Sequence, residues 1–99
     1  MTDTNSVTTD RRPKFWTGFL CVTTPAARMI EQKEIREAFR RHESGDWGEV
    51  CGEDREANER ALEYGGRLYS AYHDSKGVAF WIVTEADRSA TTVLLPYDY

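Results

Sequence analysis

The sequence predicts an α+β domain with an N-terminal strand, two or three helices, and then a three-stranded antiparallel meander, the helices packing on one face of the sheet. Three observations support this fold class. An aromatic, β-branched segment opens the apolar part of the chain, helical periodicity follows it, and three short β-type segments separated by turn residues complete the chain. The 99 residues suit one domain, and a hydrophobic content of 39% is enough for one core.

The first strand is expected at residues 15–23, whose composition (FWTGFLCVT) is aromatic and β-branched. Thr24 and Pro25 should then start a helix, with Thr24 as N-cap and the proline at the first helical position. Cys21 lies inside the apolar run. We expect its thiol, and that of Cys51, to be buried and not joined in a disulfide.

Two longer helices are predicted by periodicity and by the glycines that end them. Residues 31–43 have apolar positions spaced i, i+3, i+4 among charged residues, namely Ile35, Ala38 and Phe39. Gly45 should end this helix. The next helix is expected at about residues 53–64, ending at Gly65-Gly66.

The last third of the chain predicts three strands and two turns. The strands are expected at residues 67–73, 78–84 and 90–95, joined by a hairpin turn at 74–77 and a loop at 85–89. Residues 78–84 are the most apolar and should form the central strand. The first strand should pair with this meander, either at its edge or beside the last strand. The expected core residues are Leu68, Phe80, Trp81, Ile82 and Leu94.

Composition indicates where the protein acts and what it binds. Residues 1–13 are polar and should form a disordered tail before a domain at residues 14–99. A net charge of −4 disfavours direct nucleic-acid binding, because phosphate neutralisation supplies most of that affinity. No apolar stretch is long enough to span a membrane, and the N-terminus lacks the apolar core of a secretory signal. We therefore expect a cytoplasmic location.

Most of the expected domain resembles a family of short bacterial proteins carried by plasmids, phages and other mobile elements. The resembling segments are GDWGEVCGEDREANERAL, GGRLYSAYH, WIVTEADRSATTVLLPYDY and the Thr24-Pro25 helix start. Such proteins are labelled plasmid-related or type I restriction subunits, although a methyltransferase subunit needs a cofactor-binding βαβ domain that this chain does not supply. The family ending carries acids before the final tyrosine, whereas this chain has Tyr97-Asp98-Tyr99. The resemblance implies genomic company and not an activity.

Two charged segments are candidate partner-binding surfaces. Acids recur at helical spacing on the predicted helix at 53–64, namely Glu53, Glu56, Glu59 and Glu63. Such a row could imitate a phosphate backbone and occupy a basic groove on another protein, although an ordinary solvated helix face has the same pattern. The second segment is the loop with Glu85, Asp87, Arg88 and Ser89. It could bind a phosphate or a partner's charge, or only make turn hydrogen bonds.

Aromatic residues and histidines supply the remaining candidates. Trp47, Tyr97 and Tyr99 are candidate interface aromatics, since aromatic rings are enriched at protein interfaces. A nuclease-type site needs a base, an acid and a cation, which could come from His42, Asp46, His73 and Arg88, although nothing in their spacing requires it. No Cys/His spacing indicates a metal site, so no metal, cofactor or catalytic residue is predicted.

These observations favour a small interaction protein, without catalytic activity, that modulates or inhibits a nucleic-acid-processing or defence complex of the anti-restriction or anti-CRISPR type. Its partner would be a protein, with no membrane contact and no direct contact with nucleic acid. One alternative is a small phosphodiesterase or ribonuclease-type toxin using His42, His73 and Arg88. Another is a plain nucleic-acid-binding module. The sequence leaves the oligomeric state open.

Overall fold

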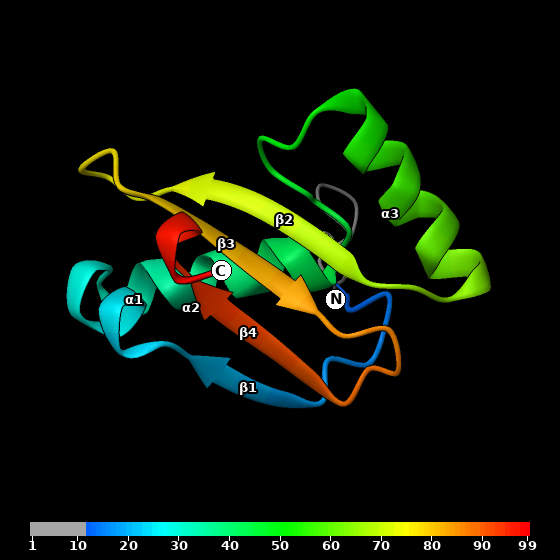
Figure 1. Cartoon of the computed structure of the whole chain (residues 1–99), viewed down its shortest axis with the longest axis horizontal. Helices are drawn as coiled ribbons and strands as arrows, with labels where there is room; N and C mark the ends of the chain where they lie inside the picture. The colour runs from blue at the N-terminus through cyan, green and yellow to red at the C-terminus, as the bar shows by residue number, and fades with distance from the viewer. Residues whose placement is uncertain (1–11) are drawn as a thin grey trace, which may run out of the picture.

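A four-stranded mixed sheet lies at the centre of the structure, a computed structural model that describes residues 12–99 (Figure 1). The strands are β1 (Phe19–Val22), β2 (Leu68–His73), β3 (Ala79–Thr84) and β4 (Ala90–Leu94). Their order in the sheet is β1-β4-β3-β2, with β2, β3 and β4 antiparallel and β1 parallel to β4. The predicted α+β class and meander are therefore present. The sheet itself has four strands, because β1 joins it beside the last strand.

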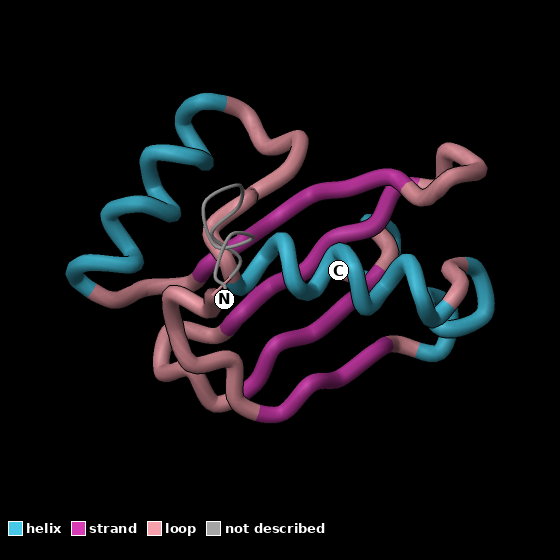
Figure 2. The backbone as a smooth tube through the Cα atoms, turned by 180° about the vertical axis from the view of Figure 1, so that it is seen from behind, coloured by secondary structure: helices cyan, strands magenta, loops and turns pink. Residues whose placement is uncertain are grey.

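Within residues 12–99, three α-helices and the 3-10 turn at the C-terminal end accompany the sheet, and they do not all cover the same face. Their bounds are α1 (Thr24–Met29), α2 (Gln32–Glu43), α3 (Gly52–Tyr64) and the 3-10 turn η2 (Pro96–Asp98). Helix α2 crosses one face of the sheet (Figure 2). Helix α3 lies beyond β2 at the edge of the sheet, and η2 lies over the face opposite α2 (Figure 1). The expectation that all helices pack on one face is thus correct only for α2 among the longer helices.

The start of α1 depends on a side-chain cap one residue earlier than predicted. The Oγ1 atom of Thr23 accepts a hydrogen bond from the backbone N–H of Ala26 at 3.2 Å, which makes Thr23 the N-cap in place of Thr24. The same hydroxyl donates to the carboxylate of Asp98 at 2.9 Å. That carboxylate also accepts from the backbone N–H of Leu95. One hydroxyl therefore starts α1 and fixes the C-terminal turn beside it.

The main core lies between α2 and the face of the sheet that it covers. Its members, all buried, are Ala26, Ile30, Ile35, Ala38, Tyr72, Phe80, Ile82, Val93 and Leu95. Among the predicted core residues, Leu68, Phe80, Ile82 and Leu94 are buried. Trp81 is only half-buried, because successive side chains of a strand point to opposite faces and Trp81 faces away from α2. Its indole packs edge-on against the rings of Tyr69 and Tyr99.

Side-chain and backbone groups close the outer edge of β2. The side-chain amide of Asn58, on α3, bonds both backbone groups of Tyr69, donating to its carbonyl at 2.7 Å and accepting from its N–H at 3.0 Å. Two residues further along, the N–H of Ala71 donates to the carbonyl of Trp47, and its carbonyl accepts from the N–H of Glu49. These bonds replace the neighbouring strand that an edge lacks, and they hold α3 against the sheet.

The opposite edge, β1, corrects two predictions. All four β1 residues are exposed, including Cys21, so the expectation of a buried Cys21 thiol is wrong. The cause is position, because an edge strand that no helix covers closely leaves its side chains in water. Cys51 precedes α3 and is also exposed, which corrects the second thiol. Neither is in a disulfide.

Gly18 sets the start of β1 later than residue 15. Its φ is +64°, outside the extended region, and a Cβ atom there would lie 2.3 Å from the backbone of Ser89. Only glycine lets the N-terminal segment pass this close to the loop before β4. Residues 15–18 are consequently not part of the strand, and β1 begins at Phe19.

The expected N-terminal tail at residues 1–13 lies, apart from residues 12 and 13, outside the described residues. Within residues 12–99, every helix is too short or too polar to cross a lipid bilayer.

We expect replacement of Ile82 by alanine to lower the free energy of unfolding by about 2–5 kcal/mol, the usual result of emptying a core site. Ile82 is fully buried on the α2 side of the sheet. Urea unfolding of Ile82→Ala and of the control Met29→Ala, whose side chain is 46% exposed, would measure the difference. A loss at Ile82 no larger than at Met29 would contradict the assignment of β3 to the core.

Candidate functional site

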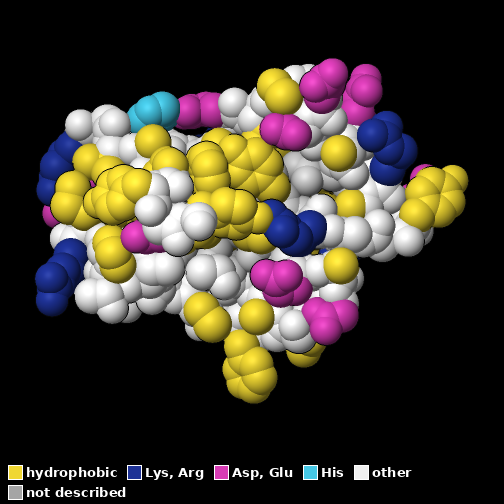
Figure 3. Space-filling model, viewed as in Figure 1, with side chains coloured by type: hydrophobic (Ala, Val, Ile, Leu, Met, Phe, Trp, Pro, Cys, Tyr) yellow, Lys and Arg dark blue, Asp and Glu magenta, His cyan; other side chains and the backbone are white. Residues whose placement is uncertain are grey.

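The acidic residues of α3 lie on one exposed side of the helix, which they share with Arg60. Ten of its thirteen residues are exposed, and the two buried ones, Asn58 and Ala61, define the side that faces the sheet. At 100° per residue, Glu56 and Glu63 point almost directly away from that side, with Glu53 and Glu59 flanking them. Acidic side chains gather over α3 at the upper right of Figure 3. The structure therefore brings the four predicted acids together on the surface.

Trp47 is buried beneath α3, which it contacts, and is therefore not an exposed interface aromatic. Its side chain is 1% exposed, which corrects the prediction that it lies at a surface. Its indole N–H donates to the carboxylate of Glu59 at 2.8 Å. Its ring packs with Val50, Ala61 and Leu68 in a second buried cluster. Glu59 therefore has a structural partner within the chain.

Arg88 in the polar loop bonds backbone carbonyls of the same chain. Its guanidinium donates to the carbonyl of Gly66 at 2.6 Å and to that of Ala61, in the last turn of α3, at 3.1 Å. It also reaches the carbonyls of Glu85 and Ala86 in its own loop. A cation at the C-terminal end of a helix satisfies unpaired carbonyls and the negative end of the dipole. Arg88 therefore fixes the end of α3 to the β3–β4 loop.

The other members of the polar loop are exposed and shape the turn. The carboxylate of Asp87 accepts a hydrogen bond from the backbone N–H of Ser89 at 2.9 Å. Hydrogen bonds from Ser89 hold the pKa of Asp87 below its usual value. Glu85 is exposed. The turn hydrogen bonds considered from the sequence are thus present, and Glu85, Asp87 and Ser89 remain at the surface.

His42, near the end of α2, is buried between that helix and the sheet. Its Nδ1 atom lies against the hydroxyl of Ser70, and its Nε2 atom is 2.9 Å from that of Thr84. Burial is the main cause that lowers its pKa to about 3, and the nearby charge of Arg88 adds to the effect. Its position completes the apolar spacing of α2 at i+7 from Ile35, which is the sequence signal that could have placed it inside.

The hydrogen bonds of this buried network fix the tautomer of His42. The hydroxyl of Thr91 donates to the carbonyl of Thr17, which can only accept, so the hydroxyl of Thr84 must donate to Thr91. Thr84 then accepts from the Nε2–H group of His42, and Nδ1 accepts from Ser70. Each hydroxyl and the Nε2–H group thus donates one hydrogen bond along the chain. The imidazole serves as a neutral connector, without access to solvent.

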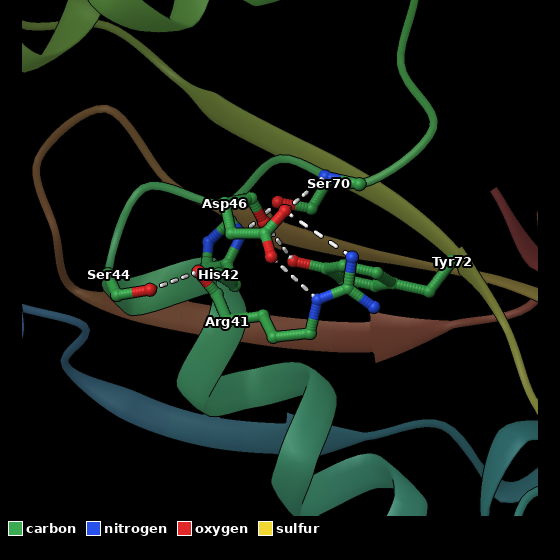
Figure 4. A network of polar contacts seen from close by, with 7 residues as sticks. Arg41, His42, Ser44, Asp46, Ser70 and Tyr72 are labelled. Atoms are coloured by element: carbon green, nitrogen blue, oxygen red, sulfur yellow. Dashed lines mark hydrogen bonds and ion pairs between the residues drawn. The ribbon is translucent and has the colours of Figure 1, made fainter. Parts of the chain in front are cut away.

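The residues considered for a nuclease-type site do not converge. His73 is exposed and lies 2.6 Å from the carboxylate of Glu49. It points to the face of β2 opposite Ser70, and so away from His42. Asp46 instead pairs with Arg41, with 2.8 Å between Oδ2 and Nε (Figure 4). The guanidinium of Arg41 also stacks on the ring of Tyr72, whose hydroxyl donates to the carbonyl of Asp46. This cluster fixes the turn after α2.

The C-terminal tyrosines lie on the sheet face opposite α2. Tyr99 packs edge-on against Trp81 with 5.7 Å between ring centroids, and the guanidinium of Arg67 lies 5.3 Å from the Tyr99 ring. A shallow pocket of about 260 Å³ is lined by these three residues with Tyr69 and Val83. Tyr97 is 78% exposed. Hydrophobic side chains gather on this face in Figure 3. Tyr99 is 66% exposed, so both tyrosines lie at the surface.

Within the described part of the chain, no three His, Cys, Asp or Glu side chains come together as a metal-binding group. No protein-family model, curated protein or solved structure matches the chain.

We expect His42 to make the fold sensitive to mild acid. Because its pKa is about 3 in the folded chain and 6.5 in the reference state, the unfolded chain binds the proton first. The stability gained by keeping His42 neutral is therefore fully present above about pH 6.5 and is lost as the pH falls toward 3. The loss in the free energy of unfolding reaches about 2 kcal/mol at pH 5. Urea unfolding at pH 7 and pH 5 should show the loss in the wild type and in His73→Asn. A loss that persists unchanged in His42→Asn would contradict this assignment.

We expect Asn58→Ala to lower the free energy of unfolding by about 1–3 kcal/mol, because both backbone groups of Tyr69 lose their partner. Arg55→Ala, an exposed change on the same helix, is the control and should alter it by less than about 0.5 kcal/mol. Hydrogen exchange at the Tyr69 amide should accelerate only in Asn58→Ala. Equal protection of that amide in both variants would show that Asn58 does not close the β2 edge.

Proposed function

We propose that this chain is a non-catalytic binding protein that inserts the acidic face of α3 into a basic, nucleic-acid-binding groove of a defence complex and inhibits it. The observation that carries the proposal is the exposure of this face on a helix that hydrogen bonds hold in place. Helix α3 lies at the edge of the molecule with its acids outward (Figures 1 and 3). Asn58, Trp47 and Arg88 fix its rotation and its end.

The spacing of the acids suits a groove built for phosphates. Carboxylates separated by three or four residues lie about 4.5–6 Å apart along a helix axis. One strand of DNA has a phosphate about every 3.4 Å along its axis, so the helix offers a similar but less dense row of charge. Such a row attracts a basic groove over long range and speeds association. The preformed helix also avoids the cost of ordering a flexible segment on binding.

The resemblance of the C-terminal half to proteins of mobile elements suggests which class of complex supplies the basic groove. Restriction and CRISPR complexes act against mobile elements and hold nucleic acid in positively charged channels. A small protein that occupies such a channel would protect the element that carries it. The separation of His42 from His73 and the internal bonds of Arg88 give no support to the phosphodiesterase alternative.

We expect this inhibition to depend on the outward acids of α3. Cells with a restriction or CRISPR system should admit more unmodified phage when they express the wild-type chain, and Glu56→Lys/Glu63→Lys should abolish that protection. Both positions are exposed and opposite the buried side of the helix. Copurification with the defence complex should weaken as salt rises, because steering charges are screened.

The control carries the same change of net charge at a different place. Glu31→Lys/Glu37→Lys replaces two exposed acids outside α3 and should inhibit as well as wild type. Circular dichroism should show both double variants folded, since exposed charges contribute only tenths of a kcal/mol, roughly 0.2–1. The proposal fails if the α3 variant protects phage as well as the control does, or if the wild-type chain protects phage from none of these systems.

A further inference from the structure

The edge of the sheet at β1 is open along its backbone. The N–H groups of Phe19 and Thr23 donate toward β4, to the carbonyls of Ser89 and Val93, at 3.0 Å each. Because alternate residues of a strand point their backbone groups to the same side, Leu20 and Val22 direct theirs away from the sheet. No backbone group among residues 12–99 bonds them. By contrast, the β2 edge is closed by Asn58 and residues 47–49.

The open edge is also apolar and uncharged. Residues 15–27 contain no charged side chain, although 30% of the whole chain is charged. Large hydrophobic side chains around the edge are exposed, namely Trp16, Phe19, Leu20, Val22 and Met29. A groove of about 360 Å³ runs between β1 and α2 and is lined mainly by apolar residues, including Leu20, Val22, Ile35 and Phe39. Folded proteins usually protect an open edge with charges or proline, and β1 has neither.

We propose that a second copy of this chain covers the edge, by antiparallel pairing of β1 with β1 about a two-fold axis. Unpaired backbone groups at alternate residues form a template that an extended strand can complete. Gly18, with φ +64°, and the start of α1 at Thr24 limit the extended segment to residues 19–23. Its centre is Cys21, so the outward groups of Leu20 and Val22 are arranged symmetrically about that residue. Two copies therefore satisfy each other's hydrogen bonds by the same contacts, as a two-fold interface requires.

This register also fixes which side chains meet. Leu20 faces Val22 of the second copy in a hydrogen-bonded pair, and the two apolar grooves beside α2 become continuous. Cys21 faces Cys21 of the second copy in a non-hydrogen-bonded pair, where Cα atoms lie about 4.5 Å apart. That separation is within the range of a disulfide, about 4.4–6.8 Å. No charged side chain of one β1 opposes another.

The dimer goes beyond the proposed function and leaves α3 free. Strands β1 and β2 are opposite edges of the sheet, and α3 packs beside β2. Pairing at β1 therefore gives one eight-stranded sheet with an acidic helix at each end. A defence complex with two basic channels would meet two copies of the same face.

The experiment uses the full chain, its mass in solution and the reagent diamide, which takes two electrons and two protons from two thiols to form a disulfide. Light scattering should give the mass of a dimer that dissociates on dilution. Cys51→Ser, which keeps only Cys21, should form a covalent dimer rapidly. Cys21→Ser keeps the other exposed thiol and should react at least about tenfold more slowly, because only a preformed pair gives a high effective concentration.

A second variant tests the edge without relying on cysteine. Leu20→Lys places a charge at the β1 edge, where the side chain is 50% exposed, and should yield a folded monomer. Tyr64→Lys, an exposed change at the end of α3, is the control and should remain dimeric. A monomer at every concentration, with equally slow cross-linking of both cysteine variants, would overturn the proposal. The same result is expected if the β1 edge instead receives a strand from another protein. A dimer that survives Leu20→Lys and does not cross-link through Cys21 would use another surface and would also overturn it.

Discussion

A buried chain of hydrogen bonds centred on His42 holds the layers of this protein together. The imidazole belongs to α2 and bonds hydroxyls on β2 and β3, and the chain continues through Thr91 on β4 to the carbonyl of Thr17 before β1. Each group in the chain is buried or partly buried, so an unmade bond would leave a polar atom without water. The contacts of Thr84 and Thr91 place a proton on Nε2, and burial lowers the pKa of His42, which favours the neutral ring. One buried imidazole therefore joins the helix to the sheet.

The surfaces follow from how the two edges of the sheet are treated. At β2, an asparagine side chain and a short backbone segment supply the missing hydrogen bonds, and α3 is held there as a consequence. At β1, nothing among the described residues does so. The molecule thus has one satisfied edge, which presents a fixed row of acids to solvent, and one unsatisfied edge, which is apolar. These two surfaces differ in the partner they suit. The acidic face of α3 attracts positive charge, and the β1 edge can pair with a strand.

Local patterns predicted the elements well, because periodicity and turn residues act over a few positions. The helices at 32–43 and 52–64 and the three strands of the meander lie within one or two residues of their predicted bounds. The error at Cys21 has a different origin. An apolar strand has the same composition at the centre of a sheet and at its edge, so the exposure of Cys21 depends on strand order. The burial of His42 was not predicted either, although its spacing from Ile35 favoured it. The bonds of Arg88 to Ala61 and Gly66 join segments that no local pattern relates.

The parallel pairing of β1 with β4 has a consequence for how the chain is made. The hydroxyl of Thr91 bonds the carbonyl of Thr17, 74 positions earlier, and Thr23 bonds Asp98, 75 positions later. Contacts so distant in sequence form slowly, because a long loop must close before they contribute. During synthesis β1 emerges well before its strand partner, because β4 lies far downstream in the sequence. Until β4 has been made, this apolar segment has no strand to pair with, which favours binding of the nascent chain by chaperones.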